Sequence, residues 1–314
     1  MSEGKEIVLQ FSNERGMGWL RDLPDFRDFT PEDTPVASDI YRATSSLKHG
    51  VSAGKSGTAA AAAAPVPTLN PQTDLRAWFS PIEDQGDLGS CTANAGVGLM
   101  EYFQRRAFGT HLDASRLFLY KATRNLLNWT GDTGAYLRTT MKAMVLFGVP
   151  PEAYWPYNIA KFDIEPSAFL YSFGQDYRAT KYYRLDPSGT TKPVLLDRIK
   201  TNLAAGLPSM FGFTVYTSIS QAAQSGKIPF PTNGETIQGG HAVDAVGYDD
   251  TKKIKNTNTG ATETTGALLI RNSWGTGWGQ NGYGWLPYEY VLRGLAVDWW
   301  SLINAEWIDT GNFG

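Results

Sequence analysis

Three residues of this sequence have side chains that could together perform nucleophilic catalysis by a thiol. Cys91, the only cysteine, follows the glycine-rich stretch EDQGDLGS and precedes a segment with helical spacing. His241 follows two glycines at the start of the apolar run HAVDAVGY, and Asn272 ends the apolar run LLIRN. A thiolate can attack a carbonyl carbon, an imidazole can move the protons, and an amide oxygen can orient the imidazole. The three residues lie far apart in the chain, so only folding can bring them together.

The position of Cys91 before a helix has an expected effect on its thiol. In the first turn of a helix, the dipole and the free backbone N–H groups favour the thiolate, so we predict a lowered pKa. The side-chain amide of Gln85 could donate, together with the backbone N–H of Cys91, to the oxyanion of a tetrahedral intermediate. The alternative is a structural role, in which Cys91 is a buried apolar residue beside a loop glutamine.

The composition excludes several classes of protein. With 42% hydrophobic and 13% aromatic residues, the chain can bury enough apolar surface to fold. Its 28 Lys and Arg residues nearly balance 31 Asp and Glu residues, so we expect no binding to nucleic acid or to an anionic membrane. A single cysteine allows no internal disulfide and no site built from several thiolates. We predict no metal and no organic cofactor, and His49 and His111, which lie in no motif, are predicted to be non-catalytic.

The chain divides into three regions. Residues 1–50 are predicted to form an irregular N-terminal arm or pro-segment that docks Trp19, Leu20, Phe26 and Phe29 on a surface. Residues 51–73, which include the low-complexity stretch VSAGKSGTAAAAAAPVPT, are predicted to be a linker, and an apolar domain follows over 74–314. Since the sequence shows no secretory signal and no long apolar run, we expect a cytoplasmic location by default, with non-classical export left open.

The apolar domain is predicted to be α+β. Apolar residues with helical spacing begin after Ser90, a candidate N-cap, and Gly109 is the candidate end of this helix. The same spacing recurs in ASRLFLYKATRNLL and LRTTMKAMVLFG. These segments predict a helical lobe over about 74–182. The runs SMFGFTVY, HAVDAVGY, GALLIRNSW and YGWLPY are separated by turn residues and predict a β-rich lobe over about 183–314. The polar insertion DDTKKIKNTNTGATETTG is expected to be a loop or a hairpin extension.

Four motifs in the same order resemble the papain family of cysteine peptidases: QGDLGSC, GGHAVDAVGY, NSWGTGWG and NGYGW. The resemblance extends from about residue 74 to the end. It implies a papain-like fold with two lobes, a helical left lobe and a β-barrel-like right lobe, and the active-site cleft between them. It also implies Cys91 as nucleophile, His241 as general base and acid, Asn272 as the residue that orients the imidazole, and Gln85 as an oxyanion-hole donor. Trp274 is expected to shield the bond between His241 and Asn272 from water.

The resemblance also implies a set of substrate contacts. The segment DTGAY is similar to the glycine-containing segment that pairs with the substrate backbone, which makes Gly134, Ala135 and Tyr136 candidates. Gly212 and Gly240 would line the pocket for the second residue upstream of the cleaved bond, and Trp274 is a further candidate for substrate binding. The alternative is that these glycines serve turns and close packing.

Some features depart from the family pattern. Thr92 follows the nucleophile where the family has tryptophan, and Leu88 stands where many secreted relatives have cysteine, so the chain resembles a disulfide-free bacterial type. The helical propeptide motif of the family does not occur in residues 1–73. The arm is therefore expected either to lie across or beside the cleft and restrict access, or to pack as a belt on the back of the domain.

These patterns predict a cysteine endopeptidase that forms a thioester on Cys91, with His241 as general acid and base and with possible control by the arm. The expected partners are a peptide or protein substrate and the arm itself. A restricted exopeptidase, transpeptidase or deamidase would use the same residues. A catalytically silent peptide-binding homologue is the alternative from another class.

Overall fold

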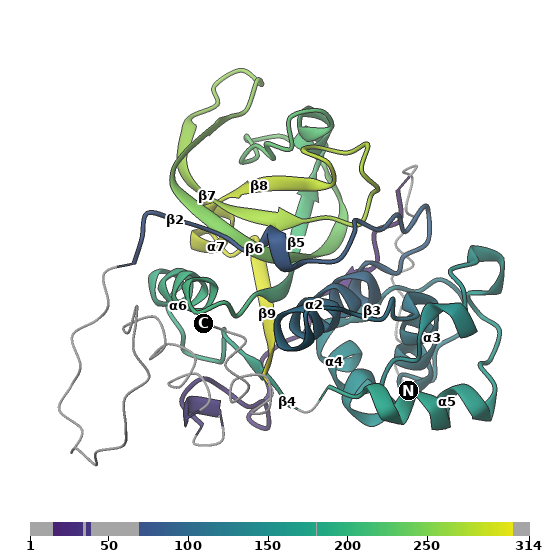
Figure 1. The fold of residues 1–314 in the computed structure, drawn as a ribbon. Helices are drawn as coiled ribbons and strands as arrows, with labels where there is room; N and C mark the ends of the chain where they lie inside the picture. The colour runs from purple at the N-terminus through teal and green to yellow at the C-terminus, as the bar shows by residue number, and fades with distance from the viewer. Residues whose placement is uncertain (1–14, 34–35, 39–68, 180, 304–314) are drawn as a thin grey trace, which may run out of the picture.

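The computed structural model describes residues 15–33, 36–38, 69–179 and 181–303, and these form a helical part beside an antiparallel sheet (Figure 1). The arrangement confirms the predicted α+β class. Predictions for the other residues fall outside the described part of the chain. They concern residues 1–14, 34–35 and 39–50 of the predicted arm, including His49, the linker up to residue 68 and the last eleven residues.

The helical part forms where the sequence predicted it. It contains α2 (Cys91–Phe108), α3 (Arg116–Leu126), α4 (Leu137–Leu146) and α5 (Ala168–Gly174), with short 3-10 turns at η1 (Arg76–Trp78), η2 (Glu152–Tyr154), η3 (Ile159–Lys161) and η4 (Gln175–Tyr177). Gly109 ends α2 in the left-handed conformation at φ 74°, as predicted. Ser90 is the N-cap residue of α2, but its side chain caps no backbone N–H and instead contacts the hydroxyl of Tyr157 at 2.7 Å.

The sheet consists of strands β4 (Lys181–Arg184), β9 (Ala296–Ile303), β5 (Ser209–Tyr216), β6 (Ile237–Lys255), β7 (Glu263–Arg271) and β8 (Tyr283–Pro287), in that order. The strand β2 (Gln72–Asp74) also pairs with β6. The helices α6 (Lys192–Ala204) and α7 (Tyr288–Leu292) and the turn η5 (Thr217–Ala222) belong to the same half of the chain.

The predicted β-barrel-like lobe needs a correction. Within the described residues, the edge strands β4 and β8 each pair on one side only, so the strands form an open sheet rather than a closed barrel. The long hairpin of β6 and β7 accounts for the polar insertion, because Lys253 to Lys255 pair with Thr265 to Glu263. The insertion is therefore a hairpin extension.

The packing of α2 on the sheet positions the candidate catalytic residues. This helix is buried along most of its length and lies against β5, β6 and β9. Its first residue is Cys91, while His241 lies on β6 opposite Phe213 of β5, and Asn272 directly follows β7. One helix end and two neighbouring strands thus meet where the helical part joins the sheet.

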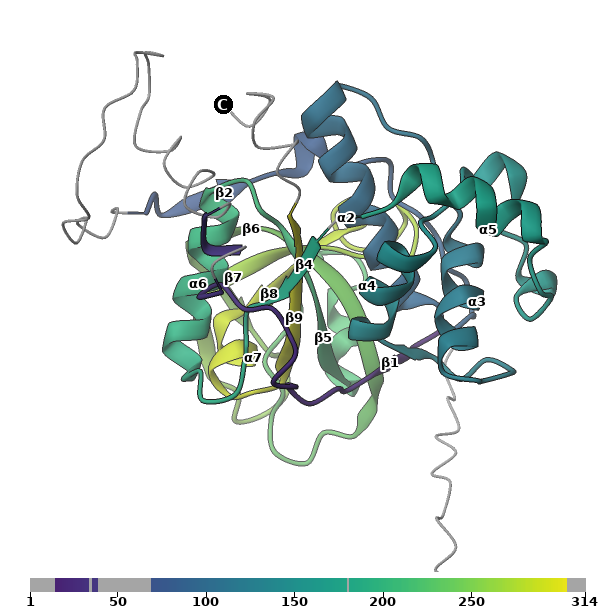
Figure 2. The same cartoon turned by 90° about the horizontal axis from the view of Figure 1, so that it is seen from below.

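In Figure 2 the arm passes between the helical part and the sheet at β1 and then continues past β9 toward α6. The short strand β1 (Trp19–Leu20) runs parallel to β3 (Ala135–Tyr136), and the Trp19 side chain is buried in the core. The predicted docking of Phe26 is wrong, since 96% of its surface is exposed, and Phe29 is half exposed. Beyond Leu20 the arm is held by charged residues instead, as described below.

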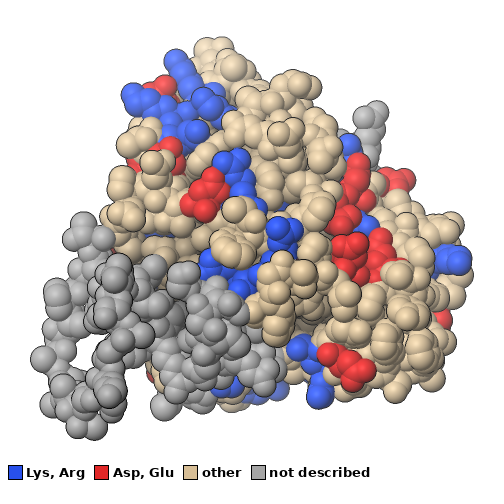
Figure 3. Space-filling model, in the orientation of Figure 1, with Lys and Arg blue, Asp and Glu red and all other residues tan. Residues whose placement is uncertain are grey.

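On the face seen in Figure 1, both basic and acidic side chains are visible among neutral ones (Figure 3). The mixture accords with the near balance of charges in the sequence. Among the described residues, no helix has the length and apolar composition needed to cross a bilayer.

Candidate active site

Cys91 lies at the start of α2 with its side chain fully buried. The backbone N–H of Gly18, from the arm, donates to Sγ over 3.4 Å. Backbone N–H groups of Ala242 and Thr92 also donate to the sulfur. Burial outweighs these donors and raises the pKa of the Cys91 thiol to about 11. The predicted lowering of this pKa is therefore wrong for this structure, because the thiol is fully buried.

His241 is held by two residues that follow β7. Its Nε2 lies 2.8 Å from Oδ1 of Asn272, and the Trp274 ring stacks on the imidazole with centroids 4.6 Å apart. Asn272 Oδ1 is an acceptor, so the proton of a neutral imidazole resides on Nε2 and Nδ1 has a free lone pair. Nδ1 is buried without a hydrogen-bond partner, and burial lowers the pKa of His241 to about 4.

The thiol and the imidazole lie in neighbouring parts of the fold, although Nδ1 of His241 makes no hydrogen bond to the sulfur. The residue that donates to the sulfur from β6, Ala242, directly follows His241 in the chain. The structure thus brings together three residues that the sequence analysis singled out from distant segments. Trp274, which is 5% exposed, covers the imidazole from solvent, as the sequence analysis expected.

Gln85 is buried beside the thiol and its amide is engaged by the arm. Its Nε2 donates to the carbonyl oxygens of Gly16, at 3.0 Å, and Leu88, at 2.9 Å. Its Oε1 accepts from the hydroxyl of Ser273 at 2.5 Å, which fixes the direction of the amide. Sequence reasoning missed Ser273, although its place between Asn272 and Trp274 in the NSWG motif was the available signal.

The arm lies against the residues predicted to contact substrate. Ala135 N donates to the carbonyl oxygen of Gly18 over 2.8 Å, and Tyr136 is opposite Leu20 in the β1–β3 register. A Cβ atom added to Gly134 would lie 2.2 Å from that same carbonyl oxygen, so only glycine permits this approach. The predicted substrate-backbone segment is therefore occupied by the chain's own arm.

Trp19 fills the space between two further predicted residues. A Cβ atom on Gly212 would come within 1.8 Å of the indole ring, and one on Gly240 within 2.8 Å. The indole Nε1 donates to Oδ2 of Asp298 over 3.1 Å. We call the space bounded by Gly212, Gly240 and Asp298 the Trp19 pocket. Sequence reasoning missed Asp298, for which the signal was an acidic residue within the apolar run AVDWW.

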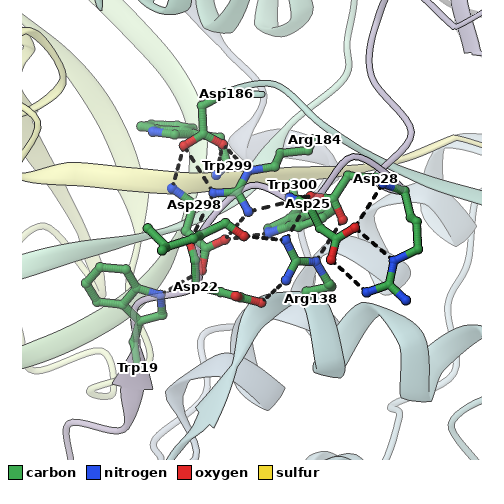
Figure 4. Close-up of polar contacts among 12 residues, drawn as sticks. Trp19, Asp22, Asp25, Asp28, Arg138, Arg184, Asp186, Asp298, Trp299 and Trp300 are labelled. Atoms are coloured by element: carbon green, nitrogen blue, oxygen red, sulfur yellow. Dashed lines mark hydrogen bonds and ion pairs between the residues drawn. The ribbon is translucent and has the colours of Figure 1, made fainter. Parts of the chain in front are cut away.

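Two arginines hold the next part of the arm (Figure 4). Arg138 of α4 donates from Nε and a terminal nitrogen to the two carboxylate oxygens of Asp28, at 2.7 and 2.8 Å, and also pairs with Asp22. Such two-pronged contacts fix both distance and direction. The backbone N–H of Arg184 donates to the carbonyl oxygen of Phe29 at 2.7 Å. The contact between the arm and the rest of the molecule thus continues well beyond Trp19.

Two other titratable residues lie outside this arrangement. Asp244 is fully buried on β6 opposite Arg271, and burial raises its pKa well above the ordinary value. His111 pairs with Asp113 at 3.0 Å, and both lie close enough to Glu101 for their ligand atoms to share a cation. Oε1 of Glu101 accepts a hydrogen bond from the backbone N–H of Ala114 in the loop before α3, so Glu101 has a structural role.

The comparisons with known proteins agree with this geometry. Residues 69–291 match the family model described as "Papain family cysteine protease". The chain belongs to the papain family of cysteine proteases. It is therefore a cysteine peptidase, a hydrolase, as the sequence motifs predicted, and its substrates are peptides or proteins.

Individual cysteine peptidases and a related viral protein are also similar to this chain. An uncharacterized peptidase C1-like protein of Acanthamoeba polyphaga mimivirus is 32% identical over 294 residues, which covers 92% of this chain and 86% of the viral protein. Cathepsin K of Gallus gallus is 29% identical over 66% of this chain and 55% of its own length. The crystal structure of xylellain, a cysteine protease from Xylella fastidiosa, superposes with a TM-score of 0.70 at 32% identity, covering 95% of this chain and 99% of xylellain. These matches confirm the papain-like fold.

Proposed function

We propose that this cysteine peptidase is an endopeptidase with Cys91 as nucleophile, and that its own N-terminal arm covers the cleft in the resting state. The observation that carries the proposal is the contact between the Gly18 N–H and the Cys91 sulfur at 3.4 Å. This contact places the arm at the atom that would attack a peptide carbonyl.

In the first half-reaction, Nδ1 of His241 accepts the thiol proton and the sulfur of Cys91 attacks the carbonyl carbon of the scissile bond. The developing oxyanion receives hydrogen bonds from the backbone N–H of Cys91 and from Nε2 of Gln85. The imidazolium then gives its proton to the leaving amine. The C–N bond breaks, and a thioester and a free amine result.

In the second half-reaction, water attacks the thioester. His241 takes a proton from that water and returns it to the departing sulfur, so the thiol and a carboxylic acid are regenerated. Asn272 keeps the ring aligned throughout, because its Oδ1 accepts the Nε2 proton. Ser273 donates to Oε1 of Gln85, which leaves Nε2 of the same amide as the donor to the oxyanion.

The arm blocks this sequence at two points. An N–H group faces the sulfur, where a substrate must present a carbonyl carbon, so the arm is bound without being cleaved. The Gly16 carbonyl oxygen occupies an N–H of Gln85 that the oxyanion needs. Both contacts must break before a peptide can react.

Peptides blocked at both ends test the endopeptidase assignment. Internal cleavage by the full chain, measured by mass spectrometry and abolished in Cys91→Ala, is the expected result. Cleavage that requires a free terminus would instead identify a restricted exopeptidase. Joined peptides would identify a transpeptidase, and loss of side-chain ammonia a deamidase.

A further inference from the structure

The Trp19 pocket ends in a carboxylate whose two oxygens have different surroundings. Oδ1 of Asp298 accepts from Nε1 of Trp300 at 2.8 Å and lies 3.2 Å from a terminal nitrogen of Arg184. Oδ2 accepts from Nε1 of Trp19. Figure 4 shows Trp19 pointing toward Asp298 from the side opposite Arg184 and Trp300. Oδ1 is therefore bound by residues of the sheet, whereas Oδ2 is bound by the side chain that fills the pocket.

The backbone holds Asp298 in this place. Its side chain is fully buried, and its φ of 64° lies in the left-handed region, which aspartate and asparagine tolerate better than most residues. Asp186 fixes the local chain by accepting from the backbone N–H groups of Asp298 and Trp299 at 2.8 and 3.0 Å. The carboxylate is thus preorganised and does not depend on the arm for its position.

The walls of the Trp19 pocket restrict the shape of the side chain that can enter it. Gly212 and Gly240 leave a flat space that a planar ring fills, since any Cβ atom there would overlap the indole. When the arm leaves, this apolar space opens while Oδ2 loses its donor. A buried acceptor without a partner is costly, so an occupant that lacks an N–H group is penalised.

The geometry points to Asp298 as a residue that determines substrate specificity. We propose that the Trp19 pocket selects peptide side chains that carry an N–H donor at the depth of the indole Nε1, tryptophan foremost, over apolar side chains of the same shape. The inference rests on the proposed endopeptidase function, in which the arm vacates the pocket before a substrate enters.

The charges around Asp298 favour a neutral donor. Without the arm, Arg184 and Arg138 balance Asp186 and Asp298, and each of the two aspartates already faces Arg184. The arm itself inserts an uncharged indole at Oδ2 and places its own carboxylates on Arg138. A tryptophan side chain satisfies both the flat walls and the acceptor.

The test compares two fluorogenic peptides on the full-length enzyme. They differ only in the residue expected to enter the pocket, the second upstream of the cleaved bond, which is tryptophan or 3-benzothienylalanine. The latter keeps the ring shape and replaces N–H by sulfur. The ratio of the two kcat/KM values is independent of how often the arm opens, because opening precedes both reactions. We expect a ratio of about tenfold in favour of tryptophan.

Asp298→Asn supplies the matched variant. Trp300 donates to Oδ1 and the positive charge of Arg184 lies 3.2 Å from it, so both favour the amide oxygen of asparagine at this place and turn its NH₂ group toward the pocket. The NH₂ group of the asparagine and the indole N–H of a substrate tryptophan are then two donors that face one another. The preference for tryptophan should therefore vanish or reverse. Equal kcat/KM values in the wild-type enzyme, or an unchanged ratio in Asp298→Asn, would overturn the inference.

A second measurement separates this inference from the peptidase assignment. Trp19→Phe removes the donor from the arm and should speed alkylation of Cys91 by iodoacetamide several-fold in the wild-type background, but not in Asp298→Asn. If neither peptide is cleaved, the endopeptidase proposal fails, yet the alkylation rates still decide whether Oδ2 selects a donor. Equal acceleration in both backgrounds would contradict that selection.

Discussion

The backbone N–H of Gly18 lies 3.4 Å from the sulfur of Cys91 and donates to it. This contact joins residues 73 positions apart. It places a backbone N–H group of the arm at the sulfur, where a reaction would need a carbonyl carbon. An amide hydrogen stabilises negative charge on sulfur but offers it nothing to attack. Under the proposed function, the arm can therefore occupy the cleft without being cleaved.

Gly18 should be essential for this cover. A Cβ atom at this position would lie 1.8 Å from the carbonyl oxygen of Gly89, a backbone atom that has little room to move. Gly18→Ala should therefore expel the arm and raise peptide hydrolysis about tenfold or more. Initial rates at low substrate concentration measure the effect.

The matched control for Gly18→Ala is Phe26→Ala, which alters an arm residue whose side chain is 96% exposed. It should leave the rate unchanged. If Gly18→Ala showed wild-type rates while remaining folded by circular dichroism, the arm would not limit access to Cys91.

Arg138 should act as an anchor of the arm outside the cleft. Its side chain is partly buried and binds the carboxylates of Asp22 and Asp28. Arg138→Ala should weaken arm binding and raise hydrolysis about fivefold, with a smaller gain at high salt, since salt already screens partly exposed pairs. Arg27→Ala is the control, because Arg27 is mostly exposed and pairs with Asp25 within the arm. Equal effects of the two substitutions would argue against an anchoring role.

The ionisation of Cys91 should depend on the arm. In the closed chain burial holds the pKa of the thiol near 11, so little thiolate is present at neutral pH. Once the arm leaves, the helix dipole and the remaining N–H donors act without the same desolvation, and the pKa should fall below its ordinary value. Ultraviolet absorbance of the thiolate, taken as the difference from Cys91→Ser, would show this in Gly18→Ala. A thiolate already present at pH 7 in the wild-type chain would contradict it.

His241 should make folding stability sensitive to acid. Its pKa is lowered from 6.5 to about 4 by burial, so the folded state binds fewer protons than the unfolded state between these values. The contribution of His241 to the free energy of unfolding is therefore fully present above pH 6.5. It is lost as the pH falls toward 4, and the loss amounts to roughly 3 kcal/mol. Urea unfolding of the wild-type chain and His241→Gln at several pH values isolates the effect. Parallel pH profiles would show that His241 is not buried as a neutral ring.

Local patterns predicted much of this site. The helix that begins at Cys91 and ends at Gly109 follows from apolar spacing and a glycine cap, and the strand that carries His241 follows from an apolar run after glycines. The motifs indicated the family as well. These features depend on residues close together in the chain, where sequence is informative.

The remaining features depend on contacts between distant segments. Trp19 and Asp298 are 279 positions apart, and nothing near either residue predicts their hydrogen bond. The aromatic character of Phe26 indicated burial, yet the charges of Asp22 and Asp28 hold that part of the arm instead. The pKa of Cys91 was predicted from its helix alone, whereas the cover supplied by Gly18 reverses its direction.

Labelling of the full chain with an epoxysuccinyl inhibitor, followed by peptide mapping, tests the central claim most directly. The account predicts a single adduct on Cys91, formed faster in Gly18→Ala than in the wild-type chain and lost in His241→Ala. An adduct at another residue, an equal rate in Gly18→Ala, or undiminished labelling in His241→Ala would contradict a thiol that His241 activates and the arm covers.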